Sequence, residues 1–193
     1  MKDKVRSRIE LLRLLLKDPV PEVRTAAAEA IEKLEATSSV DEILVALKTG
    51  TMGARISAIY ALGEIGGEKV LPPLVYCARR SEVSIRSVAA AVLGKMALPA
   101  ALPVMVELLD DVSPVVQGRA IAGLRNFQVT KDILNKLRSF LNASDGVLEA
   151  EAATTLACFK DLYSLGQIQE LLKSPHASVR QAAATALGRM PLQ

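Results

Sequence analysis

The stretch Val23–Leu34 reads VRTAAAEAIEKL, and the same twelve-residue pattern returns five more times along the chain. The later copies are ARISAIYALGEI from Ala54, IRSVAAAVLGKM from Ile85, VQGRAIAGLRNF from Val116, LEAEAATTLACF from Leu148 and VRQAAATALGRM from Val179. Their starts are 31, 31, 31, 32 and 31 residues apart, so the chain is built from an internal repeat.

Each copy has the apolar spacing of a helix. Its fifth residue is always Ala and its ninth is always Ile or Leu. The first, fifth, ninth and twelfth positions lie on one helical face, which we expect to form the core. Apolar residues spaced three and then four apart precede each copy and predict a further helix. Repeat by repeat, they are Ile9, Leu12 and Leu16; Val40, Ile43 and Leu47; Leu71, Leu74 and Ala78; Leu102, Met105 and Leu109; Leu134, Leu137 and Leu141; Leu165, Ile168 and Leu172.

Turn-forming residues separate the helices. Asp18-Pro19 and Ser174-Pro175 lie between the two helices of a repeat, and Gly66-Gly67 and Pro99 lie between repeats. Gly66 is placed to end a helix in the left-handed conformation. One helical hairpin cannot bury its apolar faces alone, so neighbouring hairpins are expected to stack on one another. The sequence therefore predicts an all-α chain with one domain, residues 1–193. Its six repeats span about residues 4–35, 39–66, 69–97, 100–128, 131–160 and 163–191.

The segment DPVPEVRTAAAEAI from Asp18 and the last copy resemble HEAT repeats of the short, 31-residue class found in phycobilisome-lyase-like proteins. The resemblance covers nearly the whole chain and implies a right-handed α-solenoid. It also implies a polar ladder, made by an Asp in the turn and an Arg six residues later. Asp18 with Arg24 fits this pattern, whereas the fourth and fifth repeats depart from it, with Gln117 and Glu149 at the Arg position.

The sequence offers little for catalysis. The only His is His176, in a turn, and no His or Cys pair has the spacing of a metal site. No Ser or Cys has a plausible His partner, and no glycine-rich phosphate loop is present. We therefore expect a protein that is not an enzyme and needs neither cofactor nor metal.

A binding surface is the better functional prediction. In HEAT arrays the second helices line the concave face, where the third, seventh and eleventh positions of each copy point outward. A smooth trough with an aromatic residue suits an extended peptide or a helix. The alternative is that its small residues reflect only helix propensity and close packing. The predicted partner-binding residues are Ile56, Tyr60, Ser87, Ala91, Lys95, Ala122 and Asn126.

Other surfaces compete with this one. A basic edge near the turns of the second and third repeats could meet an acidic partner or phosphate, or could be a solvated rim. It comprises Lys48, Arg55, Arg79, Arg80 and Arg86. The first helices carry additional apolar residues that could self-associate or pack inward. These are Leu44, Val45, Val75, Tyr76 and Val106.

The main prediction is a cytoplasmic scaffold or assembly factor that binds a protein or peptide, as a monomer or weak homo-oligomer, without membrane or nucleic acid. The alternatives are a nucleic-acid or anion binder using the basic edge, and a lyase-like or chaperone-like subunit. Cys77 occupies an apolar position and is expected to be buried, while Cys158 is expected to be exposed. The two are too far apart to form a disulfide. Whether the array continues beyond this chain is left open.

Overall fold

The computed structural model describes the backbone of residues 2–192 and the side chains of these residues except 2–4, 33 and 36–39. Within residues 2–192 the regular structure is entirely helical, which confirms the predicted class. The helices are α1 (Lys2–Leu15), α2 (Pro21–Thr49), α3 (Met52–Ile65), α4 (Leu71–Ala78), α5 (Val83–Met96), α6 (Leu102–Glu107), α7 (Pro114–Leu124), α8 (Lys131–Ser139), α9 (Leu148–Cys158), α10 (Leu165–Glu170) and α11 (Ala177–Arg189). Short 3₁₀ turns are η1 (Glu68–Val70), η2 (Pro99–Ala101), η3 (Leu108–Asp110), η4 (Phe140–Asn142), η5 (Leu162–Ser164) and η6 (Leu171–Lys173).

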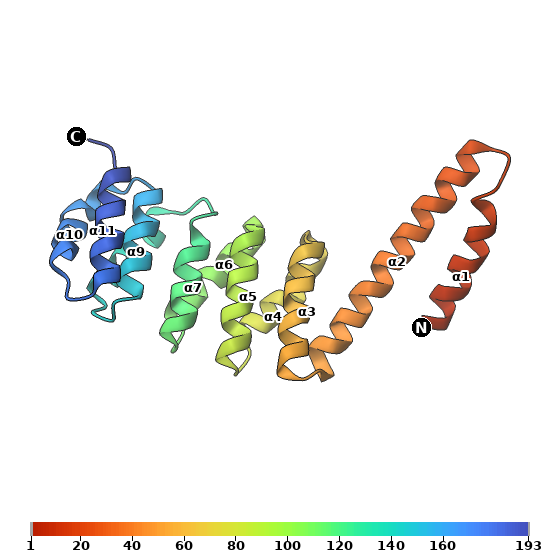
Figure 1. The fold of residues 1–193 in the computed structure, drawn as a ribbon, viewed down its shortest axis with the longest axis horizontal. Helices are drawn as coiled ribbons and strands as arrows, with labels where there is room; N and C mark the ends of the chain where they lie inside the picture. The colour runs from red at the N-terminus through yellow and green to blue at the C-terminus, as the bar shows by residue number, and fades with distance from the viewer. Residues whose placement is uncertain (1, 193) are drawn as a thin grey trace. The chain divides into compact units, whose positions relative to one another are not determined.

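The chain divides into two compact units, residues 1–62 and residues 63–193, and each is described by itself. In the C-terminal unit, α4 packs on α5, α6 on α7, α8 on α9 and α10 on α11, so each pair is a helical hairpin. The second helices of these hairpins, α5, α7, α9 and α11, pack side by side in chain order (Figure 1). This serial arrangement is that of an α-solenoid.

The repeat positions predict the interior of this unit. The fifth and ninth positions of α5, α7 and α9 are completely buried. Small Ala at the fifth position allows the helices to approach closely, while Leu at the ninth fills the space between them. These residues are Ala89, Leu93, Ala120, Leu124, Ala152 and Leu156.

Glycine and proline residues mark two of the helix boundaries in the C-terminal unit. Gly66 and Gly67 follow α3 with φ of 69° and 75°, the left-handed region that suits residues without a Cβ. Pro114 occupies the first turn of α7, where no backbone N–H is needed for helix bonding. These helix boundaries therefore follow from local backbone preferences.

The N-terminal unit differs from the repeat pattern. α1 packs on α2, but α2 is one continuous helix from Pro21 to Thr49. The predicted boundary between the first two repeats, at residues 36–38, therefore lies within a helix and does not coincide with a helix end. The physical reason is the sequence Ala-Thr-Ser-Ser at residues 36–39, which contains neither Gly nor Pro to stop a helix.

Candidate binding surface

The outward positions of the second helices form a surface of small residues in the C-terminal unit. We call it the second-helix face, and in this unit it comprises the third, seventh and eleventh positions of α5, α7, α9 and α11. Ser87 and Ala91 on α5 and Ala122 on α7 are half-buried, whereas Lys95 and Asn126 are exposed. Because α5 and α7 pack directly on each other, the structure brings these five predicted residues onto one surface.

Several polar groups of this face have hydrogen-bond partners within the chain. The Ser87 hydroxyl donates to the Ser84 carbonyl at 3.1 Å, and the Thr154 hydroxyl donates to the Ala150 carbonyl at 2.8 Å. The Asn126 amide donates to the Gly94 carbonyl at 2.8 Å, which joins the end of α7 to α5. Around Ser87, Ala91 and Ala122, a ligand would therefore meet methyl groups and a hydroxyl that is already hydrogen-bonded.

One ion pair lies at the edge of the face. The Lys95 ammonium group donates to the Glu64 carboxylate at 2.7 Å, and both side chains are exposed. The hydrogen bond from Lys95 holds the pKa of Glu64 below its usual range. The pair is screened by solvent, so it marks a polar rim and contributes little to stability.

The two bulky predicted residues lie on α3 in the N-terminal unit. Tyr60 is exposed and Ile56 is half-buried. They are one helical turn apart on the same face of the helix. The aromatic group predicted as an anchor is thus accessible on its own helix.

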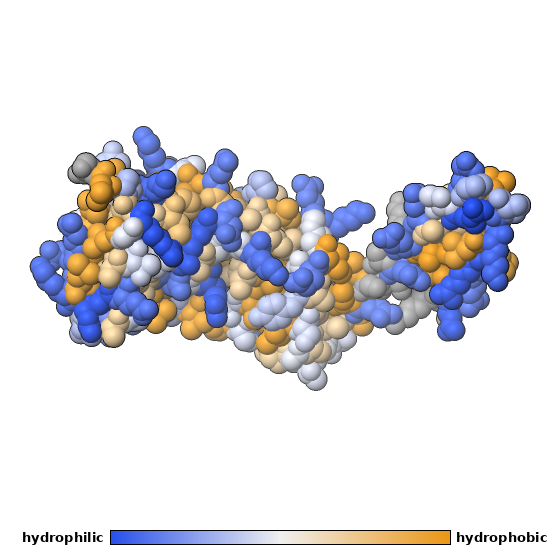
Figure 2. Space-filling model, turned by 45° about the horizontal axis from the view of Figure 1, so that its top comes forward, coloured by the Kyte–Doolittle hydropathy of each residue, from blue (hydrophilic) through white to orange (hydrophobic). Residues whose placement is uncertain are grey.

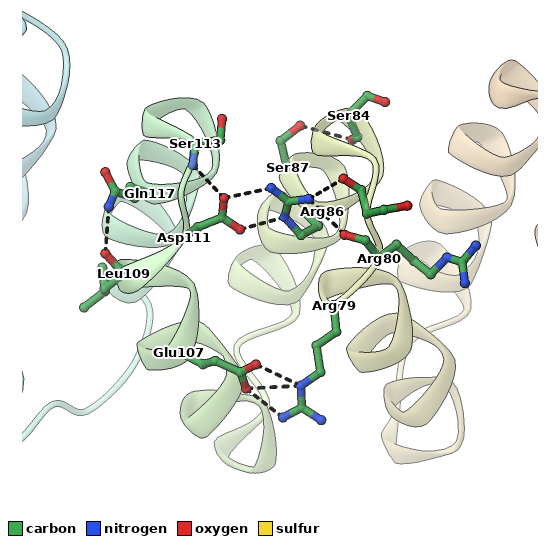
Figure 3. A network of polar contacts seen from close by, with 11 residues as sticks. Arg79, Arg80, Ser84, Arg86, Ser87, Glu107, Leu109, Asp111, Ser113 and Gln117 are labelled. Atoms are coloured by element: carbon green, nitrogen blue, oxygen red, sulfur yellow. Dashed lines mark hydrogen bonds and ion pairs between the residues drawn. The ribbon is translucent and has the colours of Figure 1, made fainter.

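The predicted basic edge is largely neutralised by neighbouring groups. Arg79 donates to both carboxylate oxygens of Glu107, with contacts of 2.7–3.1 Å, and this raises the pKa of Arg79 (Figure 3). Arg80 lies over the Tyr76 ring, 5.3 Å from its centre, and donates to the Tyr76 hydroxyl at 2.8 Å. Arg80 also forms an ion pair with Glu82 at 3.7 Å. Both arginines therefore have acidic or aromatic partners within the C-terminal unit.

Arg86 is a structural residue of the interior. It is buried, and its guanidinium donates to both oxygens of Asp111 at 2.6 and 2.9 Å (Figure 3). It also donates to the carbonyls of Arg80 and Ser81 at 2.9 and 2.7 Å. The hydrogen bond to Asp111 raises the pKa of Arg86, and the same bond lowers the pKa of Asp111. Arg86 therefore does not extend an exposed basic edge, because its donors already bind this carboxylate and the turn.

The remaining basic residues of the predicted edge, Lys48 on α2 and Arg55 on α3, belong to the N-terminal unit. Lys48 is exposed and Arg55 is half-buried. Among the apolar residues of the first helices, Val45 and Tyr76 are exposed, while Leu44, Val75 and Val106 are half-buried.

Sequence reasoning missed the polar contacts between later repeats. Arg125 occupies the tenth position of its copy, where α3, α5 and α11 have Gly. Its guanidinium donates to the Thr155 hydroxyl at 2.8 Å and pairs with Glu151. One repeat further on, Arg138 pairs with the buried Asp161 and lies 5.0 Å from the centre of the Tyr163 ring. The signal available in the sequence was that Arg125 is the only basic residue at the tenth position of the six copies.

The expectations for the cysteines are confirmed, since Cys77 is buried, Cys158 is exposed and the two do not form a disulfide. Among the described residues, no group of His, Cys, Asp and Glu side chains is arranged to hold a metal ion. No helix within residues 2–192 combines the length and apolarity that crossing a membrane requires.

The comparisons with known proteins agree with this architecture. A chain from the complex of CpcE and CpcF of phycocyanin lyase from Nostoc sp. PCC7120 is similar with a TM-score of 0.65 and 20% identity, covering 78% of this chain and 99% of that one. An engineered protein is similar with a TM-score of 0.53 and 21% identity, over 94% of this chain and 95% of its own. These identities show the fold alone. No curated protein matches the sequence. The family model of HEAT repeats matches residues 9–91, 54–125 and 134–193, so together with the stacked hairpins it shows that the chain belongs to the HEAT-repeat family.

Proposed function

We propose that this chain is a non-catalytic interaction scaffold or assembly factor that binds a partner peptide or helix on its second-helix face. The observation that carries the proposal is the character of that face on α5 and α7. Ser87, Ala91 and Ala122 are half-buried and small, and the neighbouring polar groups are satisfied within the chain. Such a surface suits apolar contact with an extended peptide or an amphipathic helix.

The basic edge gives less support to the alternative function, binding of nucleic acid or another anion. Nucleic-acid binding needs Lys and Arg side chains that can replace the counterions of phosphates. Arg79 and Arg86 are instead paired with Glu107 and Asp111. We therefore expect no retention on heparin at physiological salt, and we do not propose this function.

A lyase-like or chaperone-like subunit is a second candidate. The likeness to a chain of the phycocyanin lyase complex favours it, although at 20% identity that likeness concerns the fold. If this candidate is right, the purified chain should take up a bilin and become coloured, alone or with a second subunit. A chain that stays colourless with added bilin would leave the scaffold as the proposal.

The scaffold proposal is tested by the double substitution Ala91→Arg and Ala122→Arg. Both side chains would place a charge and a long stem on the face without entering the core. Loss of one apolar contact region should weaken partner binding at least about tenfold, or roughly 1.4 kcal/mol. The matched control is Ala100→Arg, at an exposed position of η2.

The readout is a pulldown with tagged wild-type protein and both variants, with circular dichroism to show unchanged helicity. Partner proteins retained by the wild type and by Ala100→Arg should be lost with the double variant. Equal retention by all three proteins would contradict the proposed site.

A further inference from the structure

The first repeat exposes positions that the later repeats bury. In the first helix, the third apolar position is Leu16, which is 40% exposed. Its equivalents Ala78, Leu109 and Leu141 are 1–2% exposed, whereas Leu172 in the last repeat is 42% exposed. No hairpin within the described residues packs over Leu172 on this side. Leu16 is exposed to a similar extent, although a second repeat follows it in the sequence.

The second helix of this repeat gives the same result. Ala28 at the sixth position is exposed, as is Ala184 in the last repeat, while Ala90, Ile121 and Ala153 are completely buried. At the ninth position Ile31 and Leu187 are both half-buried. The surface through which a repeat meets its successor is therefore uncovered on the first repeat. We call this surface, made by Leu16, Ala28, Ile31 and Glu32, the forward face.

The second repeat has a complementary uncovered surface. Its first and eighth positions, Ala54 and Ala61, are half-buried. The equivalent positions in the last three repeats are all buried beneath the preceding hairpin. They are Val116, Leu148 and Val179 at the first position, and Gly123, Thr155 and Ala186 at the eighth. We call the surface of Ala54 and Ala61 the backward face.

Both faces belong to one chain, but α2 keeps them apart. In the later repeats, the second helix of one repeat and the first helix of the next are separate helices joined by a short connection. Here these two segments are the two halves of one continuous helix of 29 residues, about 43 Å long (Figure 1). While α2 is intact, its first half cannot lie beside the helices of the second repeat. Figure 2 shows hydrophobic residues, in orange, at the surface of the hairpin of α1 and the first half of α2, at the right of the view.

We propose that the chain forms a two-fold dimer in which the forward face of each copy packs on the backward face of the other. A second copy is the occupant because it carries an uncovered backward face. In the C-terminal unit, the positions equivalent to the forward face pack on the positions equivalent to the backward face of the next repeat. Reciprocal exchange of an identical element satisfies both copies at once and requires no change in α2. The proposal concerns the N-terminal unit and is independent of the second-helix face of α5 and α7.

The contact predicted between copies follows from the C-terminal unit. There the tenth position of one repeat meets the eighth position of the next, as Gly94 meets Gly123, where a Cβ on Gly94 would lie 2.6 Å from the Gly123 Cα. The corresponding residues in the proposed dimer are Glu32 of one copy and Ala61 of the other. Their substitution by Cys should place two thiols within disulfide distance across the interface.

The experiment uses full-length Glu32→Cys and Ala61→Cys single variants, both with Cys158→Ser to remove the exposed native thiol. Each single variant is oxidised alone, and the two are also refolded together and then oxidised. The mixture should give a covalent dimer of twice the 20.6 kDa chain mass, whereas each single variant alone should give little. A chain carrying both cysteines that forms only an internal disulfide at monomer mass would overturn the proposal, because α2 would then break and close on itself.

Light scattering on the protein without added cysteines provides the second test. The native chain should have the mass of a dimer, and Ala28→Arg should convert it to a monomer with unchanged helicity. The matched control Ala26→Arg, at the exposed fourth position where the fourth repeat already has Arg119, should leave the dimer intact. A native monomer, or a dimer that survives Ala28→Arg, would contradict the proposal.

Discussion

In the C-terminal unit, the second helices of successive repeats are joined by different chemistry at two neighbouring contacts. We call each contact between two successive second helices a joint. Between α5 and α7, Gly94 and Gly123 bring the two backbones into direct contact, and Arg86 binds Asp111 across the joint. Between α7 and α9, Arg125 replaces the glycine and reaches Thr155 and Glu151 instead. The first joint combines a close glycine contact with a buried ion pair, and the second depends on a long polar side chain in place of the glycine.

The difference shows which features of the contact between two repeats are not determined by the repeated sequence positions. The apolar positions of both joints are alike, since the fifth and ninth positions are completely buried on α5, α7 and α9. The polar contacts at the Arg position of the repeat differ between the joints. Arg86 bonds across to the next repeat, whereas Gln117 donates to the Leu109 carbonyl and Glu149 accepts from the Gly146 N–H, each within its own repeat. Stacking is therefore set by the repeated positions, while the strength of each joint is set by residues outside them.

The largest expected effect comes from breaking the Arg86–Asp111 pair. Asp111→Ala leaves a buried guanidinium without its carboxylate and should lower the free energy of unfolding by about 3 kcal/mol or more. Replacing both partners, as Arg86→Met with Asp111→Leu, should restore most of the loss. Urea unfolding measures the free energy of unfolding of the single variant and of the double variant. The exposed pair Arg79–Glu107 is the control, and Glu107→Ala should leave the midpoint unchanged. Equal effects of Asp111→Ala and Glu107→Ala would contradict the comparison.

The glycine contact should invert the usual effect of a helical Gly→Ala change. Gly188 occupies the same repeat position as Gly94, and nothing lies within 4 Å of a Cβ there, so Gly188→Ala should stabilise by up to about 1 kcal/mol. Gly94→Ala should instead destabilise by about 1–3 kcal/mol, because the added methyl meets the Gly123 backbone. Thermal unfolding of the two variants should shift in opposite directions. A shift of the same sign would show that α5 and α7 do not approach at Gly94.

The polar joint should respond to the loss of one hydroxyl. Thr155 is completely buried, accepts from Arg125 and donates to the Ile121 carbonyl at 3.2 Å. Thr155→Val should therefore cost about 1–2 kcal/mol, because Arg125 loses an acceptor in a partly buried site. Thr154→Val is the neighbouring control, since Thr154 bonds only to its own helix. If the two variants have the same chemical-denaturation midpoint, Arg125 does not join these repeats.

The acid stability of the first joint should depend on Asp111, with a smaller effect. Arg86 holds the pKa of Asp111 below its ordinary value of about 3.9. A carboxyl with a lowered folded-state pKa stabilises the fold above the unfolded-state value, and this contribution disappears as the pH falls through the folded-state pKa. The difference in unfolding free energy between wild type and Asp111→Asn should thus be constant from neutral pH down to about pH 4 and shrink below it. A difference that stays constant into stronger acid would contradict the pairing.

The sequence predicts the fold well because the repeat is carried by burial. The 31-residue period and the Ala and Leu positions identify the helical hairpins, and Gly66 marks a helix end with the expected positive φ. It fails at α2, because helix termination depends on Gly, Pro or capping residues, and the segment at residues 36–39 does not override helix propensity. Periodicity alone cannot show where one helix continues into the next.

The candidate site is predicted less completely. The outward positions Ser87, Ala91 and Ala122 follow from helical periodicity, and their partial exposure agrees with that reading. The state of the arginines does not follow, because pairing depends on which acidic residue the next repeat places opposite. Arg86 illustrates this, since its partner Asp111 is 25 residues away and lies in the turn of the following repeat.

The contact between Gly94 and Gly123 tests the central claim most directly, because it exists only if consecutive hairpins stack with their second helices side by side. Proton nuclear Overhauser spectroscopy on isotope-labelled protein can detect it. The account predicts a strong cross-peak between the α-protons of Gly94 and Gly123. If that cross-peak is missing while the sequential contacts within α5 and α7 are present, the serial stacking described here is wrong.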